Sequence, residues 1–246
     1  MSDSKQFSNP LLVNAYDSIN SLGDDADFWF REIKHLAPKS VIDFGCGTGI
    51  LTCELAKQGY ETIGVDPFGA MLEKAKEKPN ADKVRWIEGD YTKLDGLKSD
   101  LFLMTSHVAQ FLLTDKEWSG VLTNAYSALN TGGHILFDSR RSLKESFAKW
   151  PTELSKRKVT DPVLGEIEYW CDLLETTDTL ATYELHYHFL LSGEKVISKD
   201  TIIFRPKDTI EQSLKDAGFT VKTIYGDWDS SLFTETSPEM LFVAQK

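Results

Sequence analysis

Cysteine is scarce in this chain of 246 residues. Its three cysteines, Cys46, Cys53 and Cys171, are odd in number and form no CxxC pair, so neither a disulfide framework nor a zinc site is expected. Long apolar runs are also missing: no stretch of about 18 apolar residues predicts a membrane span. The polar start, MSDSKQFSNP, has no apolar core of a secretory signal. These absences predict a cytoplasmic protein with no membrane partner.

Positive charge is in deficit as well. The chain has 27 lysines and arginines against 38 aspartates and glutamates, a formal net charge of -11. A protein whose main partner is a nucleic-acid backbone usually carries a basic face, so no nucleic-acid partner is predicted. The densest basic cluster, Lys156-Arg157-Lys158, is more typical of a solvated edge than of a phosphate clamp.

Short apolar runs alternate with helical segments in the first 140 residues. After an amphipathic helical segment over 11–36, broken at Gly23, we predict strands at Ser40–Phe44, Glu61–Val65, Val84–Glu88, Asp100–Met104 and His134–Asp138. Helices are predicted between them at Thr48–Gln58, Gly69–Lys78 and Lys116–Leu129. Such alternation indicates right-handed βαβ units and a parallel sheet.

The pattern changes after about residue 155. Three segments rich in β-branched and aromatic residues follow, at Glu166–Leu174, Leu180–Leu191 and Lys195–Arg205, with a hairpin turn predicted at Ser192-Gly193-Glu194. A helix over Lys207–Ala217 and two strands, Phe219–Tyr225 and Met240–Ala244, end the chain. We therefore predict a doubly wound, seven-stranded Rossmann-like α/β sheet with an antiparallel β insertion before the last helix. The expected units are a helical cap over 1–38, a core over 39–150 and 206–246, and an insertion over 151–205 that covers the substrate.

A glycine-rich loop is expected between the first strand and the first helix of the core. It reads Asp43-Phe44-Gly45-Cys46-Gly47-Thr48-Gly49. Glycines let the backbone approach a ligand closely, and the helix start beyond them offers free N–H groups. A dinucleotide loop would need its third glycine at Ile50, so this loop does not match the pyrophosphate-binding pattern.

Two carboxylates follow at the ends of the next strands. Asp66 lies 23 residues after Asp43 (66 minus 43), where an acidic side chain can accept hydrogen bonds from both hydroxyls of a ribose. Asp90 follows the third strand in Glu88-Gly89-Asp90-Tyr91, either as a ligand or as an ordinary turn aspartate.

The D-x-G-x-G-x-G loop, with Asp66 and Asp90 in register, resembles the class I methyltransferases, in their small-molecule branch. The motifs cover 41–91, the strand alternation extends the likeness to about 138, and the final helix and strands extend it to the end. The resemblance implies S-adenosylmethionine as cofactor, its ribose on Asp66 and its adenine amino group on Asp90. The β insertion is similar to that of sugar N-methyltransferases. The implied cofactor-binding residues are Asp43, Gly45, Cys46, Gly47, Gly49, Asp66, Pro67, Asp90, Tyr91, Thr105 and Tyr16.

Substrate-facing residues are expected beyond the carboxyl ends of the fourth and fifth strands. His107 is the candidate acid or base, with a merely lining histidine as the alternative. Gln110 lies one helical turn further and could hydrogen-bond the substrate. Arg140 could bind a carboxylate or phosphate, or equally pair with a surface acid. The methylases of adenine, cytosine N4 and protein glutamine often carry N/D-P-P-Y/F here, and this chain does not.

Aromatic residues are expected to close the site. Tyr16, in a Tyr-Asp pair that often covers the cofactor in the resembling family, and Phe28-Trp29-Phe30 could form a lid over the sulfonium, with Trp29 as a substrate contact. A buried core is the alternative. Tyr169, Trp170, Tyr183 and Tyr187 are expected to cover a compact ligand. His186 and His188 share one face of a strand, but without further ligands cross-strand packing is favoured over a metal, so no metal site is predicted.

Together these features predict in-line methyl transfer from S-adenosylmethionine to N, O, S or C of a small molecule. The protein would orient two bound reactants and exclude water. One alternative is a non-catalytic protein that binds S-adenosylmethionine on the same fold. Another is a nicotinamide oxidoreductase, against which Ile50 argues.

Overall fold

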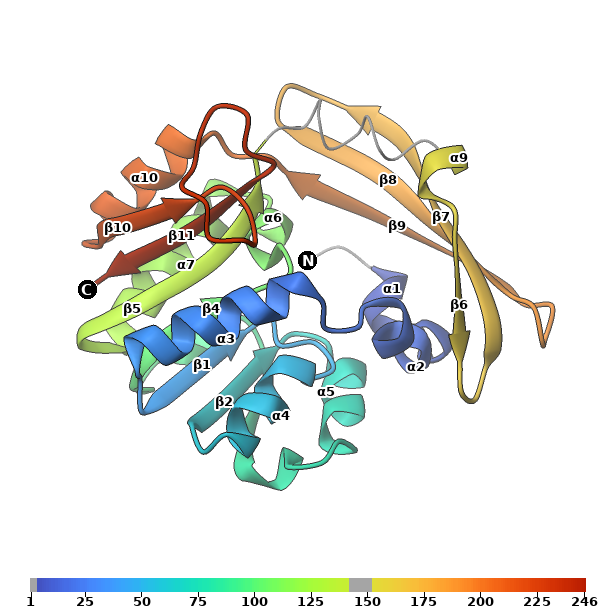
Figure 1. Cartoon of the computed structure of the whole chain (residues 1–246), viewed down its shortest axis with the longest axis horizontal. Coiled ribbons are helices and arrows are strands. Elements are labelled where there is room, and N and C mark those ends of the chain that lie inside the picture. Colours follow the sequence, from blue (N-terminus) through green and yellow to red (C-terminus); the bar gives the residue numbers. More distant parts are fainter. Residues whose placement is uncertain (1–3, 142–151) are drawn as a thin grey trace.

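The computed structural model describes residues 4–141 and 152–246. It contains a seven-stranded sheet in the order β10-β11-β5-β4-β1-β2-β3, in which β11 alone runs antiparallel to its neighbours (Figure 1). The strands are β1 (Ser40–Phe44), β2 (Glu61–Asp66), β3 (Val84–Glu88), β4 (Ser99–Met104), β5 (Leu129–Arg140), β10 (Thr220–Tyr225) and β11 (Glu239–Gln245). The predicted doubly wound, Rossmann-like sheet is confirmed.

Helices cover both faces of this sheet. The main ones are α3 (Asp24–Leu36), α4 (Ile50–Lys57), α5 (Gly69–Lys76), α7 (Asp115–Ala128) and α10 (Lys207–Asp216). Buried residues of α3 and α4 pack on one face, and those of α7 and α10 pack on the other. Helix α7 begins at a capping box, in which Thr114 and Glu117 satisfy each other's backbone N–H groups. Two helical packing layers thus hold the carboxyl ends of β1, β2, β4 and β5 at one common edge.

The insertion forms a separate antiparallel sheet of four strands, β6 (Arg157–Asp161), β7 (Gly165–Thr176), β8 (Leu180–Phe189) and β9 (Lys195–Ile203). Its inner face packs against α2 (Pro10–Ile19) through Ile167, Tyr187 and Phe189. The short helix α1 (Lys5–Ser8) lies between this sheet and α5. The predicted antiparallel insertion outside the parallel sheet is therefore confirmed, and β6 extends it by one strand that the residue pattern did not reveal.

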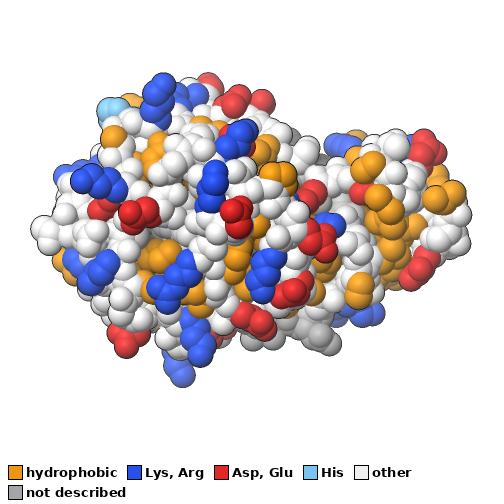
Figure 2. Space-filling view, turned by 90° about the horizontal axis from the view of Figure 1, so that it is seen from below, with side chains coloured by type: hydrophobic (Ala, Val, Ile, Leu, Met, Phe, Trp, Pro, Cys, Tyr) orange, Lys and Arg blue, Asp and Glu red, His pale blue; other side chains and the backbone are white. Residues whose placement is uncertain are grey.

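Short elements complete the described chain. They are α6 (Val108–Phe111), α9 (Thr152–Ser155) and two 3-10 turns, η1 (Ala81–Lys83) and η2 (Tyr91–Leu94). The expected boundary between core and insertion, at 150 and 151, lies outside the described residues. Among the helices of the described chain, none combines the length and the apolar character that crossing a bilayer requires. On the face shown in Figure 2, lysines, arginines and carboxylates are interspersed.

Candidate active site

A cavity of about 1180 Å³ opens at the carboxyl ends of the parallel strands. Its walls come from the glycine loop, from the ends of β2, β4 and β5, from α2 and α3, and from the inner face of the insertion. Figure 1 shows the two sheets on either side of this region, with α1 and α2 at its rim. Pockets for a single small ligand usually occupy about 300–1,000 Å³, so this cavity has room for two reactants side by side.

The three glycines of the loop have left-handed backbone angles but different tasks. Gly45 (φ 77°) and Gly47 (φ 55°) line the cavity, as expected for a loop beside a ligand. Gly49 (φ 72°) does not line it. A Cβ at Gly49 would lie 2.6 Å from Cη2 of Trp86, so this glycine permits α4 to pack closely on the sheet. Gly49 therefore has a packing role, and its contact with the cofactor stays a prediction.

Asp66 ends β2 at the cavity wall. Its Oδ2 accepts a hydrogen bond from the Gly47 N–H at 2.8 Å, and its Oδ1 accepts one from the Phe68 N–H at 2.9 Å. Burial raises the pKa of this carboxyl to about 6, although both N–H donors oppose the rise. Each carboxylate oxygen has a further lone pair, so Asp66 can accept two more donors, such as the hydroxyls of a ribose.

Asp43, the penultimate residue of β1, lies in the same wall. Its Oδ2 accepts from the Thr52 hydroxyl at 2.6 Å, whereas its Oδ1 is buried with no hydrogen-bond partner among the described residues. Burial raises the pKa of Asp43 to about 6. An unpartnered buried carboxylate oxygen is costly unless a ligand supplies a donor. The amino group of the methionine part of S-adenosylmethionine has the charge and the donors that this oxygen lacks.

Asp90 is a turn aspartate that also lines the cavity. Its Oδ1 accepts from the Thr92 N–H at 2.9 Å and from the Thr92 hydroxyl at 2.6 Å, which caps the η2 turn. Asp90 also lines the cavity, next to Tyr91. The turn therefore holds the aspartate at the cavity wall, and its contact with the adenine amino group stays a prediction.

The Tyr16-Asp17 pair joins α2 to the glycine loop. Asp17 accepts from the Thr48 hydroxyl and from the Lys78 ammonium, both at 2.5 Å. Tyr16 lines the cavity, and burial together with nearby Asp66 raises its pKa. The remaining sequence-predicted cofactor residues, Cys46, Pro67 and Thr105, also line the cavity.

At the far end of the cavity, His107 lies between two carboxylates. Its Nε2 is 3.1 Å from Oε2 of Glu239 and 3.2 Å from Oδ2 of Asp138. The His107 backbone N–H also donates to Oδ2 of Asp138 at 2.8 Å. His107 and Ser106 both have left-handed backbone angles, φ 61° and 57°, which non-glycine residues rarely adopt. The surrounding contacts therefore hold His107 in a specific orientation.

Glu239 was missed by the sequence analysis. It begins β11, which pairs antiparallel with β5 so that Glu239 lies opposite Arg140. No local pattern marks Glu239, because its neighbours in the site come from strands far away in the chain. One signal could have indicated Glu239: it begins a strand directly after a polar loop, near the carboxyl edge of the sheet.

Arg140 lines the cavity, and Gln110 lies behind it. Nη1 of Arg140 donates to Oε1 of Gln110 at 3.0 Å, and Nε2 of Gln110 donates to the Ile203 carbonyl of β9 at 3.0 Å. Gln110 is buried and does not line the cavity. Gln110 holds Arg140 and connects it to the insertion, because α6 turns its side chain toward β9. Its direct contact with the substrate stays a prediction.

The aromatic wall differs in part from the expected one. Trp29 and Tyr183 line the cavity. Phe28 is fully buried against Trp29 and Tyr225, and Phe30 packs against the same core. The expected covering residues Tyr169, Trp170 and Tyr187 do not line the cavity.

The alternation of side chains along a strand explains part of this correction. Trp170 alternates with Cys171, which lines the cavity, so Trp170 faces the opposite side of the insertion sheet, where it stacks on His186 at 5.0 Å. Phe7, Phe68, Phe111 and Trp228 line the cavity although the sequence analysis did not name them. Within the described residues, no group of three histidine, cysteine or carboxylate side chains could hold a metal ion.

Comparison with known proteins decides the family. Residues 41–133, which contain the glycine loop and both strand-end aspartates, match the family described as "Methyltransferase domain". A protein from Geobacillus sp. (strain WCH70) that is named as a methyltransferase is 28% identical over 216 residues, covering 85% of each chain. Residues 41–133 of the chain thus carry a methyltransferase domain, as the resemblance predicted. The predicted family, enzyme class and methyl donor, S-adenosylmethionine, are thereby confirmed.

Solved structures share the whole fold of this methyltransferase. A methyltransferase from Clostridium acetobutylicum superposes with a TM-score of 0.79 at 17% identity, covering 96% of this chain and 97% of the other. A sugar N-methyltransferase from Streptoalloteichus sp. superposes with a TM-score of 0.75 at 17% identity, covering 94% and 90%. The insertion is thus part of a fold that other methyltransferases also have.

Proposed function

We propose that this methyltransferase transfers the methyl group of S-adenosylmethionine to a small molecule held beneath the insertion sheet. The observation that carries the proposal is the single cavity of about 1180 Å³. One end is bounded by the glycine loop with Asp43 and Asp66, and the other end by His107 and Arg140. A concave cavity with walls from α2, α3 and the insertion suits a compact acceptor better than a polymer.

The residues divide between the two reactants. Asp66 would hold the ribose, Asp43 the amino group of the methionine part and Asp90 the adenine amino group. Gly45, Cys46, Gly47, Pro67, Tyr91 and Thr105 would form the remaining cofactor wall, with Tyr16 covering it. Trp29, His107 and Arg140 would contact the acceptor. The cap over 1–38 and the insertion over 151–205 would serve as covers for the core of 39–150 and 206–246.

The proposed reaction is an in-line displacement. The sulfonium supplies an electrophilic methyl group, and the acceptor atom attacks it from the opposite side. The protein contributes by aligning the two reactants and by excluding water, which together can account for several kcal/mol of the barrier. One of the solved structures with the same fold is named as a sugar N-methyltransferase, which is consistent with a small acceptor.

Labelled S-adenosylmethionine tests this proposal. The protein is incubated with four separate acceptor pools: tRNA, DNA, a protein lysate, and metabolites below about 1 kDa. We expect label chiefly in the metabolite pool, and label chiefly in a macromolecule would contradict the small-molecule acceptor. Tight binding of S-adenosylmethionine with no label in any pool would favour the non-catalytic alternative.

A further inference from the structure

We propose that the acceptor is an amine that binds as its ammonium ion and gives a proton to His107. Glu239 is the positioning residue that orients His107 for this proton transfer. This inference rests on the proposed function. It comes from the cluster at the far end of the cavity, where one imidazole lies within 3.2 Å of two carboxylates, Asp138 and Glu239. Two carboxylates therefore flank the one imidazole that lines the acceptor end of the cavity.

The charge balance of this cluster calls for a cation. Two carboxylates face one histidine, and the neighbouring Arg140 supplies one positive charge. Asp138 is fully buried, and its Oδ1 has no hydrogen-bond partner among the described residues. A buried, half-satisfied carboxylate is costly. An ammonium group brings one positive charge and three donors, whereas a hydroxyl brings one donor and no charge.

The surroundings of Asp138 agree with this. Burial raises its pKa to about 6, His107 and Arg140 lower it, and Glu239 raises it. Trp228 packs edge-on to the His107 ring, with ring centroids 6.5 Å apart, and is itself part of the cavity wall. The Trp228 ring thus shields the cluster from water, so that its charges interact with little screening.

Glu239, the side-chain hydrogen-bond partner of Nε2, and the adjacent Asp138 together determine which nitrogen of His107 is basic. Both carboxylate oxygens lie at Nε2, so the ring proton belongs on Nε2 as a donor. The lone pair is then on Nδ1. General-base catalysis by histidine uses this arrangement: a carboxylate holds the N–H of one ring nitrogen, and the other nitrogen accepts the proton.

The steps balance as follows. The ammonium of the acceptor gives one proton to Nδ1 of His107, directly or through one water, and becomes a neutral amine. The amine lone pair forms an N–C bond to the methyl group while the C–S bond breaks, and the electron pair of that bond remains on sulfur as a thioether. The methylated product is again an ammonium ion, and the proton on His107 leaves to solvent.

Acetylation of the acceptor pool tests the substrate class. One half of a metabolite extract is treated with acetic anhydride in neutral aqueous buffer, which acylates amines and spares most hydroxyls, and the other half is mock-treated. With labelled S-adenosylmethionine, we expect the treated pool to take up at least about tenfold less label. Undiminished label in the acetylated pool would overturn the amine inference alone. No label in the mock-treated pool would overturn the proposed function, and this inference with it.

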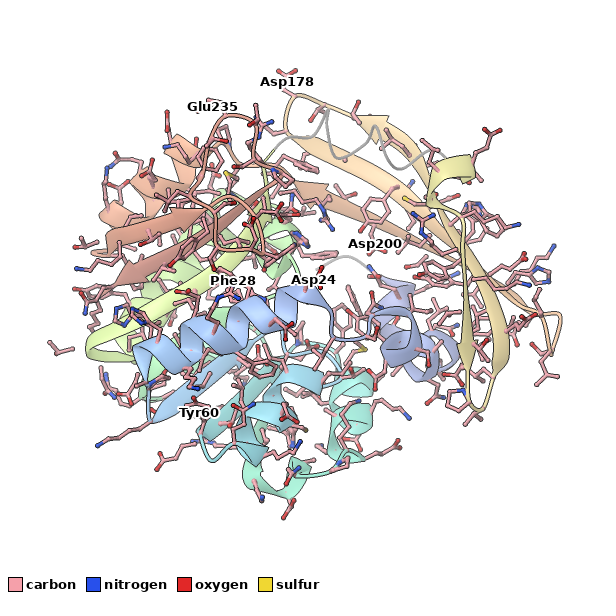
Figure 3. The ribbon with its side chains drawn as sticks, in the orientation of Figure 1. Asp24, Phe28, Tyr60, Asp178, Asp200 and Glu235 are labelled. Atoms are coloured by element: carbon pink, nitrogen blue, oxygen red, sulfur yellow. The ribbon has the colours of Figure 1, made fainter. Side chains whose placement is uncertain are left out.

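Glu239→Gln tests the positioning role with the mock-treated extract as acceptor. At about pH 7 we expect a rate about tenfold lower than that of the unmodified enzyme, because the oriented base is impaired. The difference in rate between Glu239→Gln and the unmodified enzyme should become smaller toward about pH 9.5, where more of the amine is already neutral in solution. Glu235→Gln, an exposed glutamate on the preceding loop (Figure 3), should keep the full rate at every pH.

Two results would overturn the role of Glu239. One is an unchanged rate in Glu239→Gln, and the other is a deficit of the same size at every pH, which indicates structural damage alone. Calorimetric binding of S-adenosylhomocysteine confirms that the variant site is folded. Should Glu239→Gln not fold, Glu239→Asp withdraws the carboxylate by one methylene, and the same narrowing of its deficit with rising pH is expected.

Discussion

Two buried aspartates at the strand ends carry most of the polar chemistry at the cofactor end. Asp66 already accepts two backbone N–H groups and has two further lone pairs for a ligand. Asp43 has one oxygen satisfied by Thr52 and one with no partner among the described residues. Both carboxyls therefore have acceptor capacity left for the donors of a ligand, which the proposed function assigns to the cofactor, and their contributions can be measured separately.

Asp66→Ala should weaken cofactor binding by about tenfold to a few hundredfold. The ligand would lose two hydrogen bonds to a charged acceptor, each of about 1.5–3 kcal/mol, and water would replace part of that. Calorimetric titration with S-adenosylhomocysteine measures the effect. Asp82→Ala, in the η1 turn away from the cavity, serves as control. An unchanged dissociation constant for Asp66→Ala would show that the ribose lies elsewhere.

Substitutions at two loop glycines should separate folding from binding. Gly49→Ala forces a Cβ toward the Trp86 ring at a left-handed φ, so we expect a loss of about 1–3 kcal/mol in the free energy of unfolding. Cofactor affinity should change little. Gly47→Ala has the same strain of a left-handed φ but meets only ordinary contact with Met71, so its loss in the free energy of unfolding should be the smaller one. Because Gly47 lines the cavity, its larger effect should be on affinity. Denaturant unfolding and calorimetry on both variants check this contrast, which the reverse pattern would refute.

At the scale of elements, the N-terminal segment connects the insertion to the cofactor half. Gln6, at α1, donates from Nε2 to Asp200 of β9 at 3.1 Å, and its backbone N–H donates to the Ser198 hydroxyl at 2.9 Å. Phe7 packs on Phe68 and Phe111, with ring centroids 5.1 and 5.6 Å apart. Asp200 lies beside α1 in Figure 3. The segment therefore closes one rim of the cavity.

Asp200→Ala should loosen this segment. Asp200→Ala removes the carboxylate that accepts from Gln6 and Ser198, and hydrogen bonds to a carboxylate contribute about 1.5 kcal/mol or more. We therefore expect amide hydrogen exchange over 5–19 to be at least about tenfold faster. Hydrogen exchange read by mass spectrometry measures it. Asp178→Ala, at the turn between β7 and β8 far from α1, should leave that exchange unchanged (Figure 3). Equal protection in Asp200→Ala would show that the aromatic contacts alone hold α1.

At the scale of the whole molecule, the buried carboxyls couple stability to pH. Burial raises the pKa values of Asp43, Asp66 and Asp138 to about 6, against an ordinary value of 3.8. The folded protein therefore binds more protons than the unfolded chain between these values. The stability that these groups contribute is complete below about pH 4 and is lost as pH rises through about 6. His134, whose pKa burial lowers, acts in the opposite direction but more weakly.

The cofactor-free protein should thus be less stable at about pH 8 than at about pH 5.5, by about 2 kcal/mol. Urea unfolding at both pH values measures the difference. Saturating S-adenosylhomocysteine should reduce it, because donors from the ligand stabilise the ionised forms of Asp43 and Asp66. Asp43→Asn should reduce the difference in stability between the two pH values in the cofactor-free protein. A free protein that is more stable at the higher pH would contradict the assignment.

The sequence by itself determined those features that depend on neighbours in the chain. Alternating apolar runs indicated the parallel sheet, and the change of pattern after about residue 155 indicated the antiparallel insertion. The glycine loop and the strand-end residues Asp43, Asp66 and Asp90 were predictable, because strand ends and turns follow local spacing. All three aspartates line the cavity.

Only the tertiary structure decided the contacts between distant segments. The pairing of β11 with β5 places Glu239 beside His107, and the docking of α1 places Phe7 in the cavity wall. The inward-facing side of the insertion sheet places Tyr183, but not Trp170, in the cavity wall. The close contact of Trp86 gives Gly49 a packing role. None of these has a local signature, because each arises from how whole elements pack to bury apolar surface, and that packing depends on the chain as a whole.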